Sequence, residues 1–155
     1  PTAELARYNP AGDTWQTLEP MPTSRDHLTA AAASGKLYVI GGRKGALATN
    51  LAALEVYDPG SRQWTSARDM PRKRGGIAAV AYGELIYVFG GEASTKTFGE
   101  VDAYRPATDE WLSAGTMPTP RHGLGAAAVG ERIYTVAGGK RPRWSVSVVN
   151  EAYRP

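Results

Sequence analysis

The hydrophobic residues of this chain fall into short runs separated by turns, and the runs have the composition of β-strands. Three runs rich in β-branched and aromatic residues each lead toward a pair of glycines. A run rich in alanine precedes each of them. Alanine favours helices, but these runs are short and a glycine-containing turn follows each, so we interpret them as strands placed where space is scarce, around a central axis. The β-rich runs are residues 37–40, 85–89 and 133–136, and the alanine-rich runs are residues 30–33, 78–81 and 126–129.

A third and a fourth strand complete each unit. The third strand carries a tyrosine, as at Tyr57, and is followed by a turn with proline at its second position, as at Pro59. Proline there has the backbone angle that type I and type II turns require. The fourth strand carries a tryptophan, as at Trp64. Each unit is therefore predicted to be a sheet of four short antiparallel strands without a helix.

The unit is repeated along the chain. The tryptophans Trp15, Trp64 and Trp111 are separated by 49 and 47 residues, and four other features recur in the same order. We interpret residues 1–155 as one repeat region with units at about 8–56, 57–103 and 104–152. The other repeated positions are Tyr8, Tyr57, Tyr104 and Tyr153 in Tyr-x-Pro, Met21, Met70 and Met117 in Met-Pro, Arg25, Arg74 and Arg121, and the glycine pairs 41–42, 90–91 and 138–139.

In this order and at this spacing, the glycine pair, the tyrosine and the tryptophan resemble the Kelch repeat. The resemblance covers essentially the whole chain, and it implies an all-β fold of Kelch-type β-propeller blades, each with four antiparallel strands. In that family the propeller usually presents a ligand or a partner protein to loops on one face, but the fold does not specify one activity. Glycine pairs allow positive φ or close backbone approach. Tryptophan and tyrosine offer flat surfaces for packing one blade against the next.

Three units do not close a ring, because propellers have about 4 to 8 blades. We expect thirteen strands in groups of two, four, four and three, from a third strand at residues 5–8 to another that ends at Tyr153. Two flat apolar blade faces are then exposed, which a soluble monomer does not tolerate. The chain is thus predicted to be a three-blade sector that is part of a longer propeller or dimerises into a closed ring, with six blades as the expected number. In either case we expect the isolated chain to self-associate as a homo-oligomer.

The composition narrows the possible functions. The net charge of +3 comes from basic residues spread along the chain, so we expect no nucleic-acid partner. No apolar stretch approaches the roughly 20 residues of a membrane span, and the first residues do not resemble a signal peptide. The chain contains no cysteine, which excludes disulfides and thiolate chemistry. We expect no cofactor and no metal, because the two histidines, His27 and His122, lack clustered carboxylates.

The repeats differ mainly in the loop between the second and third strands. The interval from the second glycine of each pair to the next tyrosine is 15, 13 and 14 residues, whereas the other intervals are nearly constant. One extra residue between Tyr134 and Gly139 predicts a β-bulge in the third copy. The third loop also contains Trp144, which lies outside the repeat register and beside basic residues. Loops that vary over a constant scaffold commonly carry binding, so Trp144 is interpreted as a partner-binding hot spot, with packing over the adjacent blade as the alternative.

The repeated arginines lie in the connections from each outer strand to the next inner strand. They either bond loop carbonyls or contact an acidic partner. In a four-stranded blade these connections emerge at the same end as the variable loops, so we predict a positively charged face that binds a protein, a peptide or a small anionic ligand. Lys140 lies on the same face. The candidate binding residues are Arg25, Arg43, Lys44, Arg74, Lys96, Arg121, His122, Arg141, Arg143 and Trp144.

Two classes of function remain open. The first is a non-catalytic recognition module, which is favoured because no nucleophile-elbow or phosphate-loop motif is present. The second is a carbohydrate-active or sugar-acid mutarotase-like Kelch enzyme with its site at the mouth of the ring. A broad loop surface with Trp144 exposed favours the module. A ligand site near the axis that is lined by arginines and a carboxylate favours the enzyme.

Overall fold

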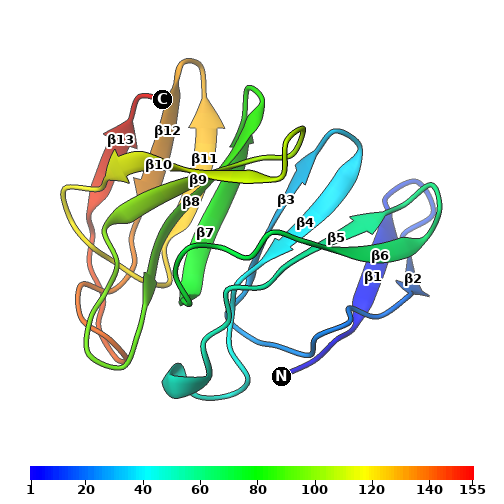
Figure 1. Ribbon diagram of the computed structural model, residues 1–155, viewed down its shortest axis with the longest axis horizontal. Helices are drawn as coiled ribbons and strands as arrows, with labels where there is room; N and C mark the ends of the chain where they lie inside the picture. The colour runs from blue at the N-terminus through cyan, green and yellow to red at the C-terminus, as the bar shows by residue number, and fades with distance from the viewer.

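The computed structural model describes all residues from Pro1 to Pro155, and they form thirteen strands in four antiparallel sheets (Figure 1). The predicted grouping of two, four, four and three strands is confirmed. None of the helical segments is long and apolar enough to cross a membrane. The strands are β1 (Leu5–Asn9) and β2 (Thr14–Leu18) in the N-terminal hairpin; β3 (Thr29–Ala33), β4 (Lys36–Ile40), β5 (Leu54–Asp58) and β6 (Gln63–Ala67) in blade 1; β7 (Gly75–Tyr82), β8 (Leu85–Glu92), β9 (Glu100–Arg105) and β10 (Glu110–Thr116) in blade 2; and β11 (Gly125–Val129), β12 (Arg132–Val136) and β13 (Asn150–Tyr153) in blade 3.

The alanine-rich strands are the innermost strands of the blades, as the sequence predicted. Strand β7 lies beside both β3 and β11, and the backbone N–H of Ala79 in β7 donates to the Thr29 hydroxyl of β3 at 3.0 Å. Small side chains let neighbouring inner strands approach closely, because they leave little volume between the backbones. A turn of 3-10 helix, η1 (Leu47–Thr49), lies in the β4–β5 loop.

Two hydrophobic cores lie between consecutive blades. In the first, Ile40 and Leu54 of blade 1 pack with Val88 of blade 2, and all three are buried. In the second, Phe89 of blade 2 packs with Ile133 of blade 3. Blade 2 therefore contributes one face to each core, and the stability of every blade depends on its neighbours.

The repeated tryptophans join consecutive units. Trp64 stacks at a tilt on Tyr57, with 5.1 Å between ring centroids, and its indole N–H donates to the Glu19 carbonyl after β2 at 2.9 Å. The indole N–H of Trp111 makes the same bond to the preceding blade, at Arg68, at 2.8 Å. The predicted packing role of these residues is confirmed. Trp15, in the N-terminal hairpin, has no unit before it and is 72% exposed.

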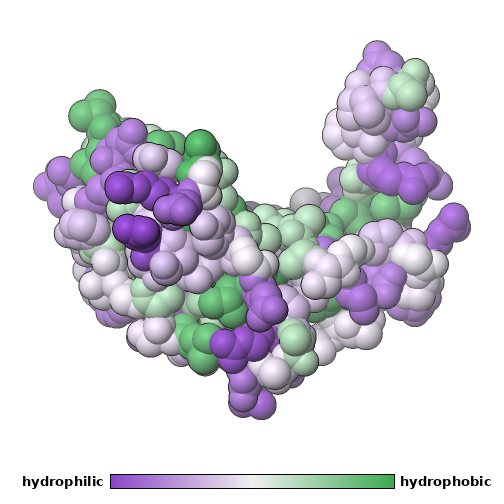
Figure 2. All heavy atoms as spheres, turned by 90° about the horizontal axis from the view of Figure 1, so that it is seen from above, coloured by the Kyte–Doolittle hydropathy of each residue, from purple (hydrophilic) through white to green (hydrophobic).

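The blades form an open arc. Figure 2 shows a U-shaped outline whose two arms are not joined, with hydrophobic residues visible along the bottom of the U. On blade 3 the residue equivalent to the fully buried Ile40 and Phe89 is Val136, which is 43% exposed. In blades 1 and 2 this face packs against the next blade, whereas in blade 3 it is uncovered.

The predicted β-bulge in the third repeat is wrong. Strands β11 and β12 pair without a register shift from Gly125 to Val136. The two positions held by Gly41 and Gly42 in blade 1 are held in blade 3 by Ala137 and Gly138, because the backbone N–H of Gly41 donates to Ala53 and that of Ala137 donates to the equivalent Val149. Gly139 is therefore the residue after the pair, and the repeats have the same length up to this point.

Ala137 is tolerated because nothing packs where its side chain points. It has a φ of 58°, close to the 60° of Gly41 and the 67° of Gly90. A Cβ added at Gly41 would lie 2.7 Å from the Arg74 carbonyl oxygen of the next blade, and one at Gly90 would meet the Arg121 carbonyl in the same way. The following blade requires glycine at those two positions, whereas in this structure no blade packs against Ala137.

Replacing Ala137 by glycine should raise the free energy of unfolding by about 1 kcal/mol, because a non-glycine residue in the left-handed region costs about 1–2 kcal/mol and glycine returns part of this as chain entropy. The matched change Gly90→Ala should lower it by at least about 2 kcal/mol through overpacking. Urea titration of both variants measures the difference. A loss in Ala137→Gly contradicts the assignment of Ala137 to the glycine position.

Self-association stays a prediction. The uncovered positions Trp15 and Val136 favour it, and analytical ultracentrifugation of the isolated chain should show a species larger than 16.5 kDa. Suppose that a partner blade packs on blade 3 as blade 2 packs on blade 1. The carbonyl of its repeated arginine would then lie against the Ala137 methyl group. Replacing Ala137 by glycine should therefore strengthen such an association. A monodisperse monomer at high concentration excludes it.

Candidate functional site

The outer-to-inner connections and the β4–β5, β8–β9 and β12–β13 loops meet at one end of the arc, the lower end in Figure 1. Asp26 and Arg43 exchange two backbone hydrogen bonds, both of 2.9 Å, and His122 exchanges two with Gly139, of 2.9 and 2.8 Å. The structure therefore brings together the two sets of segments that the sequence assigned to one face. We call this end, formed by the connections and these loops, the loop face.

Three of the candidate binding residues lie inside the blades. Arg25, Arg74 and Arg121 are fully buried. The Nη1 group of Arg121 donates to the Ala137 carbonyl at 2.6 Å and to the Val149 carbonyl at 2.9 Å. The other two arginines bond the equivalent carbonyls. Of the two roles considered for these arginines, a bond to loop carbonyls or contact with an acidic partner, the structure shows the bond to carbonyls. The three arginines are therefore not part of the proposed site.

Each buried arginine also faces a carboxylate on the third strand of its own blade. Arg25 pairs with Glu55, Arg121 with Glu151 at 2.8 Å, and Arg74 with Asp102 at 2.6 Å. Burial lowers the pKa of Arg74 to about 10, against the opposing charge of Asp102. Arg74 is therefore still protonated at neutral pH and is a buried cation.

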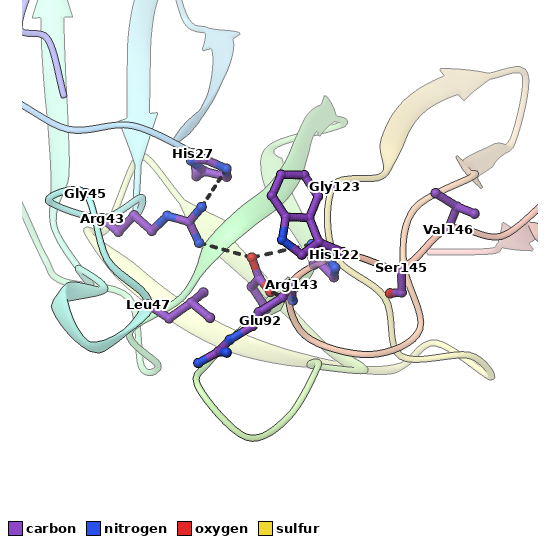
Figure 3. A pocket seen from close by; sticks show the side chains of 11 residues that line it. His27, Arg43, Gly45, Leu47, Glu92, His122, Gly123, Arg143, Ser145 and Val146 are labelled. Carbon is purple, nitrogen blue, oxygen red and sulfur yellow. Dashed lines mark hydrogen bonds and ion pairs between the residues drawn. The ribbon is translucent and has the colours of Figure 1, made fainter.

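Glu92, at the end of β8, connects the loops of all three blades (Figure 3). Its carboxylate accepts a hydrogen bond from Arg43 Nη1 of blade 1 at 3.1 Å and one from the backbone N–H of Arg143 of blade 3 at 2.7 Å. Its Oε1 also lies 3.5 Å from His122 Nδ1. In blade 3 the position equivalent to Arg43 and Glu92 is held by Gly139. A Cβ at Gly139 would lie 2.6 Å from His122 Nε2, so the glycine leaves room for this histidine.

Arg43 continues the network toward the first connection. Its Nε donates to Asp26 at 3.1 Å, and its Nη2 lies 2.7 Å from His27 Nε2. The other ring nitrogen of His27 lies 2.7 Å from the Asp26 carboxylate. Partial burial alone would raise the pKa of Asp26, but the hydrogen bonds and charges of His27 and Arg43 outweigh it and hold this pKa below its ordinary value. Asp26 is therefore an anion at neutral pH.

His27 occupies a backbone position that is glycine in the other two repeats. The N–H of Gly76 donates to the His27 carbonyl at 2.8 Å, and the N–H of Gly123 donates to the Gly76 carbonyl at 2.7 Å, so a chain of bonds links the blades beside the inner strands. All three residues have positive φ, of 52°, 68° and 60° in chain order. A histidine held in this region is strained, and such strain is concentrated at functional sites.

The third loop presents Trp144 to solvent, where it is 100% exposed. The loop is nevertheless held in place: Arg143, with a φ of 69°, donates its N–H to Glu92, and the Ser145 hydroxyl bonds the backbone of Arg141. His122 Nε2 lies 3.1 Å from the Arg141 carbonyl. Packing over the adjacent blade, the alternative for Trp144, does not occur.

A hollow of about 690 Å³ lies among these groups. Its size falls in the usual range of ligand sites, about 300–1,000 Å³. No group of three or more His, Asp or Glu side chains is arranged to hold a metal ion. The hollow is lined chiefly by His27, Arg43, Leu47, Glu92, His122 and Trp144.

The basic residues of the loop face divide into paired and unpaired groups. Arg43 belongs to the network around Glu92, and Lys96 lies 3.8 Å from Glu100 and 4.6 Å from the centre of the Phe98 ring. Four basic side chains of the variable loops make no ion pair within 4 Å and are exposed. They are Lys44, Lys140, Arg141 and Arg143.

Two residues of the site were not among the sequence candidates. Glu92 and His27 are both recognisable only when the repeats are aligned on the glycine pair and on the repeated arginine. In that alignment Glu92 is equivalent to Arg43 and Gly139, and His27 is equivalent to Gly76 and Gly123. The signal was a departure from the repeat at a position with a special backbone role.

Comparison with known proteins agrees with the fold. The profile of the KLHDC2/KLHL20/DRC7 Kelch-repeats domain matches residues 2–145. Kelch-like protein 4 of Homo sapiens is 42% identical over 41 residues, which are 26% of this chain and 6% of that protein. The class defined by these sheets is that of Kelch-type β-propeller blades, and the chain belongs to the Kelch-repeat family.

The buried and exposed arginines should behave differently on truncation. Arg25→Ala leaves Glu55 buried without its partner, so the free energy of unfolding should fall by about 3–5 kcal/mol. Arg141→Ala should change it by less than about 0.5 kcal/mol, as for an unpaired surface residue. Denaturant titration distinguishes the two, and similar losses in both variants contradict the division between blade interior and loop face.

Proposed function

We propose that this chain is a non-catalytic recognition module whose loop face binds an acidic segment of a protein partner. The carrying observation is that the loops that line the hollow bear four exposed basic side chains without an ion-pair partner, next to a fully exposed tryptophan. Unpaired charge of one sign attracts a partner of the other sign and raises its rate of association. The general role of the Kelch-repeat family supports this proposal.

Trp144 and its neighbours have the properties of a binding hot spot. Tryptophan and arginine are the residues most enriched among energetically important interface positions. Trp144 stands between Arg143 and Ser145 on a loop whose backbone is bonded to Glu92 and His122. The side chain is thus presented before any partner arrives, which reduces the entropy lost on binding.

The alternative of a sugar-acid mutarotase-like enzyme has less support. Such a site needs polar side chains that are free to bind hydroxyl and carboxylate groups of a substrate. In the hollow, Arg43, Glu92 and His27 already bond one another or neighbouring side chains. These three polar groups serve to position the loops, and the free charge belongs to Arg143 and to neighbouring basic residues of the loops.

The test uses a fluorescein-labelled, glutamate-rich peptide as the probe and fluorescence anisotropy as the measurement. The double charge reversal Arg141→Glu/Arg143→Glu should weaken binding at least fivefold, and binding by the unmodified chain should weaken as salt rises, because salt screens exposed charges beyond about 10 Å at 0.1 M. The reversal Arg62→Glu/Arg132→Glu, on turns at the opposite end of the blades, is the matched control and should change affinity less than twofold. Absence of binding at low salt, or equal effects of both reversals, contradicts the proposal.

A further inference from the structure

The hollow and its edge differ in chemistry, and this difference specifies the partner further. We propose that the acidic partner segment carries one large apolar side chain between its acidic residues, and that this side chain enters the hollow while the acidic residues bind the basic side chains at the edge. The inference rests on the proposed function and names the part of the partner that the hollow accepts.

Among the Arg and Glu side chains that line the hollow, Arg43 and Glu92 pair with each other, and Arg143 alone makes no ion pair. Arg43 uses all three of its guanidinium nitrogens, on Asp26, Glu92 and His27. The carboxylate of Glu92 lines the hollow as the ion-pair partner of Arg43, and it would repel an entering carboxylate. The positive charge of Arg43 is balanced by Glu92 and Asp26. A carboxylate therefore gains little beside Arg43 and is better placed against Arg143 and the unpaired basic residues of the adjoining loops.

Three apolar side chains line the hollow beside this network. Leu47, in η1 of blade 1, and Val146 of blade 3 lie on different sides (Figure 3), and Trp144 of blade 3 contributes the third apolar surface. Trp144 and Val146 are 100% and 91% exposed. Apolar side chains left in water at a formed concavity favour an apolar occupant, because covering them removes apolar surface from water on both partners.

The edge of the hollow carries the charges that an acidic flank requires. Lys44 follows Arg43 in the loop of blade 1, and Lys140 and Arg141 lie in the loop of blade 3. The loops of both blades line the hollow, and all three basic side chains lack an ion-pair partner. An acidic residue on either side of an apolar anchor would thus meet a cation. Charge complementarity and the apolar walls together select this occupant.

The experiment compares two labelled peptides of equal length and charge, each with four glutamates on either side of a central residue. The central residue is tryptophan in the anchor peptide and alanine in the control peptide. The unmodified chain should bind the anchor peptide at least tenfold more tightly by fluorescence anisotropy. The variants Leu47→Ala and Trp144→Ala should remove most of this preference and leave the affinity for the control peptide within twofold.

Two further variants separate the edge from the hollow. Lys140→Glu/Arg141→Glu should weaken both peptides by the same factor and leave the preference for tryptophan unchanged. Val129→Ala, at an exposed valine that does not line the hollow, should change neither peptide. Each variant is compared with the unmodified chain by urea titration, so a loss of folding is recognised separately.

The outcomes distinguish the two proposals. If the unmodified chain binds both peptides equally, the anchor inference is overturned while the acidic-partner proposal stands. If Trp144→Ala weakens both peptides equally, the indole acts outside the hollow and the inference is again overturned. If neither peptide binds at low salt, the proposed function itself fails. A tenfold preference that Leu47→Ala and Trp144→Ala abolish supports the inference.

Discussion

A guanidinium group buried in each blade holds the end of the second strand to the start of the third. Arg74 donates to the Gly90 carbonyl at 2.9 Å and the Glu100 carbonyl at 2.8 Å, and pairs with Asp102. Without this donor, the carbonyl that ends the second strand, such as that of Gly41, would lose its hydrogen bond, which costs about 1–3 kcal/mol. The variable loop begins and ends at these two carbonyls. The buried arginine is therefore what allows the loop to differ between repeats without disturbing the blade.

The site lies where the repeats stop resembling one another. Glu92 contacts both neighbouring blades because the equivalent positions there are held by different residues. Arg43 in blade 1 supplies the opposite charge, and Gly139 in blade 3 leaves space. His27 replaces a glycine in the chain of backbone bonds between blades. These departures convert three similar blade ends into one asymmetric hollow. A repeat scaffold supplies the positions, and single substitutions supply the chemistry.

The uncovered blade face shows the same dependence on neighbours. Gly41 and Gly90 lie against a carbonyl of the following blade, whereas the equivalent Ala137 lies on a face that nothing covers. Whatever covers this face must accommodate a methyl group that the two internal blade contacts do not contain. The constraint arises from close backbone approach, and it distinguishes blade 3 from the blades before it.

The sequence by itself determined the four-stranded unit, the order and number of the strands and the end at which the loops meet, because these follow from periodicity, turn residues and the alternation of strand direction. Periodicity identified Arg25 as a repeated position, but it could not decide between a buried carbonyl bond and a ligand contact, since both require the same residue at the same spacing. Counting intervals also misassigned the third glycine pair, because Ala137 can take the place of a glycine only when no carbonyl packs against it. The pairing of Glu92 with Arg43, and the exposure of Trp144, were decided by tertiary structure alone. Both depend on distances between blades that are about 50 residues apart in the chain, and no local pattern encodes those distances.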